Sequence, residues 1–158
     1  MVSTVERVWK TVAELLGARR GSVLSIPADA TVHAALERMA EHDVGVLVVL
    51  DGGKPAGIFS ERDLARKVEL RGRTAKDTTV REAMTPEVLY VTPGHTLDRC
   101  MVLMKKDGVR HLVVVEDDKV VGVVSARDIL VDAATEAEKH IRGLETDRLV
   151  MTTYTGTY

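Results

Sequence analysis

Aromatic residues and cysteines are scarce in this chain, and both shortages limit what it can do. Five of its 158 residues are aromatic, too few to build the stacked platforms on which single-stranded nucleic acids bind. The single cysteine, Cys100, excludes an internal disulfide and a cysteine-built metal site. Because Cys100 falls on the apolar side of a predicted helix, we expect it to fill space in the core.

The chain also lacks excess charge and long apolar runs. Its formal net charge of −2 gives no global field to attract nucleic acid or an anionic membrane. No apolar run approaches the roughly 18–20 residues of a membrane-spanning helix, and the first residues resemble neither a signal peptide nor a transit peptide. We therefore expect a cytoplasmic protein whose partners include neither nucleic acid nor membrane.

Motifs for metal binding and catalysis are missing as well. The five histidines show no H-x-x-x-H or H-E-x-x-H spacing, and the glycines form neither a P-loop nor G-x-G-x-x-G. No nucleophile stands beside a base in the manner of an acyl-transfer site. The sequence thus predicts no metal ligand, no catalytic residue and no enzyme.

What the chain does have is an internal repeat. Residues 23–68 align without a gap on residues 88–133, at a spacing of 65 residues. Two copies are too few for an open solenoid, which needs about three, so we expect a closed pair packed about a pseudo-twofold axis. Identical residues recur late in each copy: Gly57 and Gly122, Ser60 and Ser125, Arg62 and Arg127, Asp63 and Asp128.

Each copy predicts the same order of elements: strand, helix, strand, strand, helix. The apolar run 46–50 suits a strand buried on both sides, and turn residues at 51–54 predict a hairpin to the next strand. The fold class is therefore mixed α/β (α+β). The predicted elements, with the second copy in parentheses, are strands 23–26 (88–91), 46–50 (112–115) and 56–59 (120–124), and helices beginning near Thr31 (Thr96) and after Ser60 (Ser125).

The flanking segments are predicted from periodicity and composition. Apolar residues at a 3.6-residue spacing predict an amphipathic helix over 4–16, and 80–84 predicts a short helical turn. The last helix is expected to continue to about Leu149, before a frayed polar tail at 151–158. The predicted division is an N-terminal helix at 1–20, repeat domains at 21–79 and 80–135, and a C-terminal extension and tail at 136–158.

The repeated Ser-x-x-Asp motif has two interpretations. As a capping box, the serine hydroxyl accepts a hydrogen bond from a free helix N–H, and the acid accepts one from the backbone N–H of the serine. Such a cap contributes about 1 kcal/mol of stability and needs no ligand. The local pattern alone favours this interpretation. Alternatively, the helix N-terminus and the neighbouring arginine bind a phosphate, the aspartate accepts both ribose hydroxyls, and the preceding glycine lets a flat ring approach the strand.

Residues 23–133 resemble a tandem pair of cystathionine-beta-synthase-type (CBS) domains, a Bateman module, and in particular small stand-alone proteins of this group. The resemblance covers about 110 of the 158 residues, and Leu112-Val113 departs from the Leu-Pro that is commoner in the family. The motifs that carry it are "IPADATV" and "VTPGHTL", "GIFSERD" and "GVVSARD", "EAMTPEV" and "RHLVVV".

The resemblance implies a regulatory, energy-sensing module with two clefts for adenine nucleotides. AMP is the first expectation, with ATP, ADP or NAD(H) as alternatives, and no cofactor is required. Carried over to this sequence, the first cleft would use Ser60, Arg62, Asp63, Met84, Tyr90, Val91, Arg110 and His111, and the second Ser125, Arg127, Asp128, Ser25, Ile26 and Pro27. We expect the first cleft to bind more tightly, because only it gains Arg110 and His111 and because Arg66-Lys67 become Val131-Asp132 in the second copy.

The resemblance also implies partners. We expect a homodimer, for which the apolar stripe of the N-terminal helix is suited, and a separate regulated protein that responds to nucleotide binding. The alternative is a structural or interaction dimer whose capping boxes are only caps. A weak nucleotide hydrolase is a third idea, against which no general base is evident beside the expected phosphate.

Overall fold

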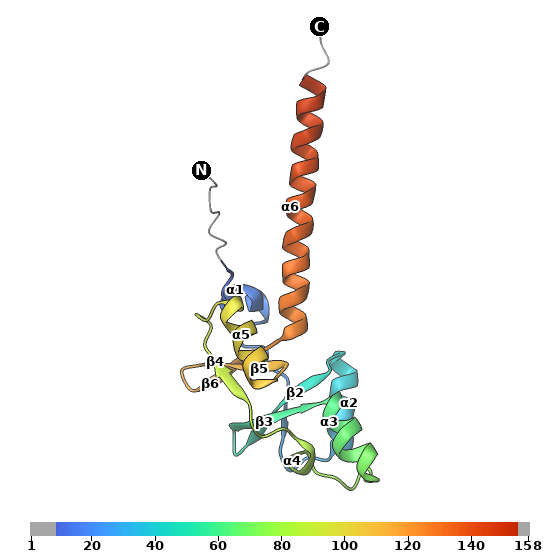
Figure 1. The fold of residues 1–158 in the computed structure, drawn as a ribbon. Coiled ribbons are helices and arrows are strands. Elements are labelled where there is room, and N and C mark those ends of the chain that lie inside the picture. The colour runs from blue at the N-terminus through green and yellow to red at the C-terminus, as the bar shows by residue number, and fades with distance from the viewer. Residues whose placement is uncertain (1–8, 155–158) are drawn as a thin grey trace.

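The computed structural model describes residues 9–154, which form two α+β units and a long C-terminal helix (Figure 1). In the first unit the sheet order is β1–β2–β3, with β1 parallel to β2 and β2 antiparallel to β3. The elements of the first unit are β1 (Ser25–Pro27), α2 (Val32–His42), β2 (Val46–Asp51), β3 (Lys54–Ser60), and a helical segment made of α3 (Glu61–Asp63), η2 (Leu64–Val68) and η3 (Glu69–Arg71).

The second unit repeats this arrangement. Its sheet order is β4–β5–β6 with the same parallel and antiparallel pairs, and even the register shift at Val49/Leu50 recurs at Val114/Val115. The predicted order of elements and the mixed α+β class are therefore confirmed. The elements of the second unit are β4 (Leu89–Val91), α5 (Leu97–Asp107), β5 (His111–Glu116), β6 (Lys119–Ser125) and α6 (Ala126–Tyr154).

The two cores exchange short helices. The helix α1 (Val12–Leu16) precedes the first unit in sequence but buries Val12 and Leu16 in the core of the second. Conversely, α4 (Val80–Ala83), which the sequence predicted as a helical turn ahead of the second unit, packs in the core of the first. Figure 1 shows α4 below the first unit and α1 beside α5.

Backbone hydrogen bonds fix both exchanged helices in equivalent ways. The Val80 N–H donates to the Ala30 carbonyl at 2.8 Å, and the Val12 N–H donates to the His95 carbonyl at 2.8 Å. Each helix starts from a capping box, on Thr79 with Glu82 and on Thr11 with Glu14. The segment that precedes the first unit in sequence thus completes the core of the second unit, and the segment that precedes the second unit completes the core of the first.

The sheet faces opposite the cores are also covered. Val48 and Val113 are fully buried although they belong to neither helix-covered core. By strand alternation they share their faces with Ser25 and Ser60, and with Tyr90 and His111, respectively. This places Ser60 and Ser125, with the helices that follow them, at the edge of the region between the sheets.

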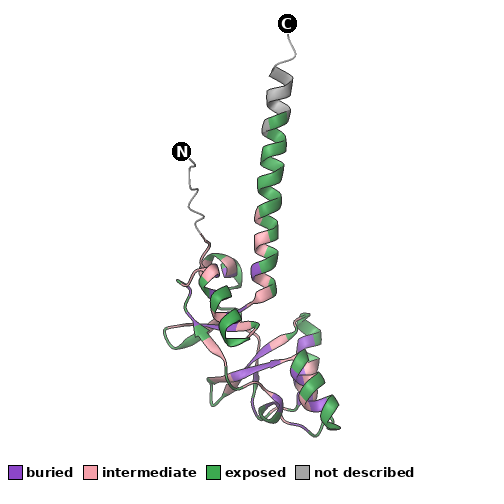
Figure 2. Ribbon diagram, viewed as in Figure 1, coloured by how far each residue is buried: buried purple, intermediate pink, exposed green. Residues whose placement is uncertain are grey.

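Two terminal predictions need correction. The N-terminal helix was expected over 4–16, but it begins at Val12, because Thr11 forms an extended bridge with Thr96 and caps the helix; residues 4–8 lie outside the described part. The helix α6 continues to Tyr154, so 151–154 are helical rather than frayed, since neither proline nor glycine interrupts the chain after Gly143 there. Residues 155–158 lie outside the described range. Figure 2 shows that α6 is exposed between its base and the residues drawn in grey.

Candidate functional site

The first Ser-x-x-Asp motif forms a complete capping box at the start of α3. The Asp63 Oδ2 accepts hydrogen bonds from the Ser60 N–H at 2.9 Å and from the Ser60 hydroxyl at 3.0 Å. In return, the Asp63 N–H donates to the Ser60 Oγ at 3.4 Å. The capping interpretation of the motif is therefore confirmed here, and it uses only one of the two carboxylate oxygens.

The other oxygen of Asp63 is also occupied. Its Oδ1 accepts the Thr85 hydroxyl at 2.8 Å and lies 2.9 Å from the Lys67 ammonium. The side chain is buried, with 5% of the residue exposed. The carboxylate that was expected to accept a ribose is thus saturated by the chain itself.

The repeat glycines contact protein rather than leaving room for a ring. A Cβ at Gly57 would lie 2.4 Å from the Thr85 carbonyl oxygen, because the segment after α4 bridges to Ile58 across this point. A Cβ at Gly122 would lie 2.7 Å from a methyl group of Leu16. On the core side of β3 and β6 these glycines therefore admit the exchanged segments, and the approach of a nucleotide base to either strand stays a prediction.

The second Ser-x-x-Asp motif, at the start of α6, is less engaged. The Asp128 Oδ2 accepts the Ser125 N–H at 3.0 Å, and the Asp128 N–H donates to the Ser125 Oγ at 3.0 Å. Within the described part of the chain, Asp128 Oδ1 accepts no protein hydrogen bond. Asp128 is half-buried, and its free oxygen leaves a carboxylate available to a ligand.

Asp128 borders a cavity of about 310 Å³ between α6 and the N-terminal segment. Arg127 and Asp128 come from the predicted site, while Ser25, Ile26 and Pro27, which the sequence assigned to this cleft, do not line it. The remaining lining residues are Lys10, Leu15, Arg19, Val131, Asp132, Thr135, Glu136 and Lys139. The cavity therefore combines the carboxylate of Asp128 with several cations.

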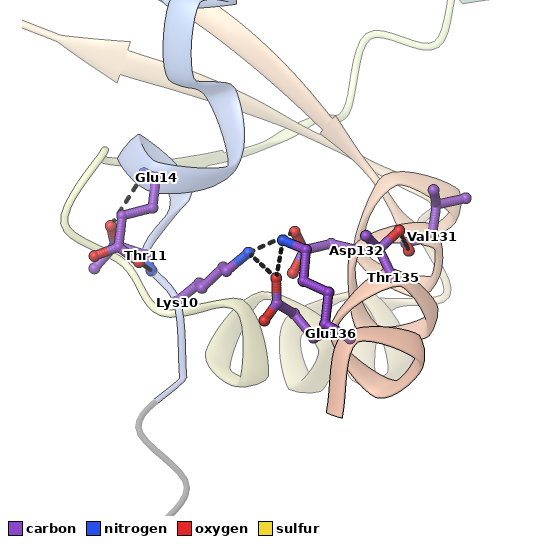
Figure 3. A network of polar contacts seen from close by, with 8 residues as sticks. Lys10, Thr11, Glu14, Val131, Asp132, Thr135 and Glu136 are labelled. Carbon is purple, nitrogen blue, oxygen red and sulfur yellow. Dashed lines mark hydrogen bonds and ion pairs between the residues drawn. The ribbon is translucent and has the colours of Figure 1, made fainter. Parts of the chain in front are cut away.

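A polar network closes one side of this cavity (Figure 3). The Lys10 ammonium lies 3.0 Å from both Asp132 Oδ1 and Glu136 Oε1, and Lys139 lies 3.3 Å from the same Glu136 oxygen. Hydrogen bonds to Asp132 and then Glu136 raise the pKa of Lys10, whereas Lys10 and Lys139 lower the pKa of Glu136. The network ties the N-terminal segment to the second and third turns of α6.

His111 lies between the two motifs. Burial lowers the pKa of its imidazole, and the positive charge of Arg110 lowers this pKa further. The carboxylates of Asp128 and Asp63 raise it. Both aspartates are therefore close enough to act on one side chain at the start of β5.

Four of the other predicted residues are exposed: Arg62, Arg110, Pro27 and Tyr90. The carbonyl oxygen of Met84 accepts a hydrogen bond from the Lys67 ammonium at 2.8 Å. Ser25 is half-buried on the face shared with Val48. The side chains of Ile26 and Val91 pack in the cores of their own units, so only their backbones could meet a ligand.

Sequence reasoning missed Lys10, Leu15 and Arg19 as lining residues. A signal for them exists: Thr11-Val12-x-Glu14 repeats as Thr79-Val80-x-Glu82 at a spacing of 68 residues. This second, shorter repeat shows that the N-terminal segment takes in the second unit the place that 79–85 takes in the first. The expected ranking of the clefts counted Lys67 in favour of the first cleft without foreseeing that its ammonium lies 2.9 Å from Asp63 Oδ1.

The described residues contain no group of three or more histidine, cysteine, aspartate or glutamate side chains placed to hold a metal ion. Burial raises the pKa of the Cys100 thiol to about 11, in keeping with its place in the second core. Among the helices of residues 9–154, none combines the length and apolar character needed to span a membrane.

Comparison with known proteins agrees with this architecture. The family model for the CBS domain matches residues 12–70 and 80–133. A protein with CBS domains from Burkholderia ambifaria has a solved structure that is 39% identical, with a TM-score of 0.74 over 78% of this chain and 93% of that one. A CBS-domain containing protein from Agrobacterium tumefaciens is 29% identical, with a TM-score of 0.71 over 79% and 94% of the two chains.

Curated relatives give the same family. A mitochondrial CBS domain-containing protein of Arabidopsis thaliana is 37% identical over 129 residues, which cover 78% of this chain. The chain spans 63% of that relative's length and 58% of the length of a relative from Methanopyrus kandleri. CBS-domain proteins are in general regulatory, non-catalytic modules. The chain belongs to the CBS-domain family and carries two CBS domains in tandem.

Proposed function

We propose that this CBS pair is a regulatory module that binds one adenine nucleotide in the cavity beside Asp128. The observation that carries the proposal is the half-buried Asp128 carboxylate, whose Oδ1 faces no protein donor in the described structure, at the edge of a cavity of about 310 Å³. A carboxylate with free lone pairs accepts the two hydroxyls of a ribose. A volume of this order suits a mononucleotide.

Cations around the cavity supply the complement to a phosphate. Arg127 and Arg19 border it and form no ion pair within the described residues, whereas Lys10 and Lys139 are already paired with acids of α6. A charged hydrogen bond from arginine to phosphate contributes about 1.5–3 kcal/mol. AMP is the proposed ligand, with ADP, ATP or NAD(H) as alternatives, and a separate regulated protein is the proposed recipient of the signal.

The position of the cavity suggests how binding is transmitted. Its walls are the base of α6 and the N-terminal segment, which are otherwise joined by the Lys10 network. A nucleotide that contacts both walls favours the conformation in which they are close. The shift is limited to the difference in affinity between the conformations. A partner that contacts the exposed part of α6 would sense this change.

Isothermal titration calorimetry with AMP, ATP and NADH tests the proposal. Saturable binding of at least one of them is expected, and Asp128→Asn should weaken it at least about tenfold because charged hydrogen bonds to the ribose are lost. Asp118→Asn is the matched control, since it makes the same chemical change in the exposed turn at the opposite end of β6. No binding of any of the three, or equal affinity in both variants, would contradict the proposal.

A second candidate function is a ligand-independent interaction dimer. The sequence assigned the dimer contact to the N-terminal helix, but Val12 and Leu16 are buried within the chain's own second unit. Exposed apolar residues lie instead on α5 and α6, beside a groove of about 270 Å³ lined by Met101, Met104, Lys105, Val109, Ala126 and Leu130. Self-association without any nucleotide response favours this candidate.

A further inference from the structure

Lys67 occupies the first cleft, which is the site around Ser60 and Asp63. Its ammonium lies 2.9 Å from Asp63 Oδ1, donates to the Met84 carbonyl at 2.8 Å, and donates to the Thr85 hydroxyl oxygen at 3.1 Å. These three oxygens come from two segments, the start of the helix after β3 and the strand-like segment after α4. Lys67 therefore links the two segments that meet at Asp63.

The carboxylate of Asp63 has no acceptor capacity to spare. Its two oxygens provide about four lone-pair sites. The Ser60 N–H and hydroxyl fill Oδ2, and Thr85 and Lys67 fill Oδ1. A ribose could bind here only by displacing Thr85 and Lys67 from a buried carboxylate, and charged hydrogen bonds are the costly ones to break.

The second cleft, around Ser125 and Asp128, lacks both groups. At the 65-residue spacing Lys67 corresponds to Asp132, which points to Lys10 at 3.0 Å rather than to its own motif. At the 68-residue spacing of the exchanged segments, Thr85 corresponds to Gly17, which has no side chain to donate. The chain therefore places a cation and a hydroxyl on one aspartate and neither on its repeat.

We infer that Lys67, assisted by Thr85, is an internal occupant that closes the first cleft to the ribose of a nucleotide, so that each chain binds a single AMP, in the second cleft. Lys67 is thus the residue that sets the binding stoichiometry of the pair. This inference rests on the proposed nucleotide-binding function. It does not follow from that function, because the repeat supplies two Ser-x-x-Asp motifs that would otherwise be equivalent.

The test is the number of AMP molecules bound per chain, measured by calorimetry and equilibrium dialysis on the full chain. The wild type should bind one, and Lys67→Met, which removes the ammonium but keeps the length of the side chain, should bind two. Arg66→Met is the matched control: it removes a positive charge from the neighbouring exposed position of η2 and should still bind one. Lys67→Arg keeps the charge and should also bind one.

Combining substitutions locates the new site. Lys67→Met with Asp128→Asn should bind one AMP with the affinity of the new site, and the second cleft should bind AMP at least about tenfold more weakly than in the wild type. Thermal unfolding of each variant in the absence of AMP checks that the chain stays folded. If Lys67→Met is unstable, Lys67→Arg still tests the inference, because a second AMP site in Lys67→Arg would overturn it.

The outcomes separate the two ideas. Two AMP molecules bound to the wild type, or one bound to Lys67→Met with the affinity of the wild type, overturns the role of Lys67 and leaves nucleotide binding standing. Absence of AMP binding by the wild type and by every variant overturns the proposed function, and the inference with it.

Discussion

At the scale of single residues, the two repeat glycines differ in what lies against them. A Cβ at Gly57 would meet backbone, 2.4 Å from the Thr85 carbonyl oxygen and 3.1 Å from Pro86 Cα, whereas a Cβ at Gly122 would meet only the methyl end of the Leu16 side chain. Backbone held by the Ile58–Thr85 bridge has little freedom to move, but a leucine side chain can change rotamer. Gly57→Ala should therefore cost about 1–3 kcal/mol of unfolding free energy, and Gly122→Ala less than about 1 kcal/mol.

Urea denaturation of both alanine variants measures this difference. The pair is its own control, because the substitution, the strand position and the neighbouring sequence are matched by the repeat. Equal losses would mean that the segment after α4 does not cross β3 as closely as described. The same measurement bears on the first cleft, since Thr85 is also the donor to Asp63.

At the scale of elements, the exchanged helix α1 makes the clearest prediction. Leu16 is 4% exposed and packs in the core of the second unit, although more than a hundred residues separate it from β6 in sequence. Leu16→Ala should cost about 2–5 kcal/mol, while Leu70→Ala, at a position of η3 that is 80% exposed, should change the unfolding free energy by no more than about 0.5 kcal/mol. Equilibrium unfolding followed by circular dichroism compares them. A loss confined to Leu70→Ala would show that α1 does not complete the second core.

This exchange marks the limit of what the sequence predicted. The order of strands and helices in each unit follows from local patterns, such as the apolar run of β2 and the turn residues after it, and these were read correctly. The periodicity of Val12 and Leu16 predicted an amphipathic helix, and its apolar stripe was assigned to a dimer contact. Periodicity is local and does not show that the stripe packs in the core of the second unit. Likewise the positions of Asp63 and Asp128 were predicted from the motif. The contact of Lys67 with Asp63 was not, because it depends on where the segment after α4 passes.

At the scale of the whole molecule, most of the large exposed apolar side chains of the described residues lie on α5 and α6. Met101 and Val102 on α5 and Leu130 and Val131 on α6 are between 41% and 64% exposed, and the groove beside Met101 and Leu130 is lined by apolar side chains and the stem of Lys105. Ile141 and Leu144 extend exposed apolar surface along the projecting part of α6, with 55% and 57% exposure. A helix that projects into water gains little from its own hydrogen bonds, and most helical stability comes from packing an apolar face.

The chain should therefore sediment as a dimer in analytical ultracentrifugation, with α5 and α6 of the two copies in contact. Leu130→Glu should shift it to the monomer, because the carboxylate would lose its hydration in a contact formed mostly by apolar side chains. Leu70→Glu is the matched control: Leu70 is 80% exposed on η3 of the first unit, away from this surface, and the variant should remain a dimer. A wild type that is monomeric at every concentration, or a dimer that survives Leu130→Glu but not Leu70→Glu, would place the contact elsewhere.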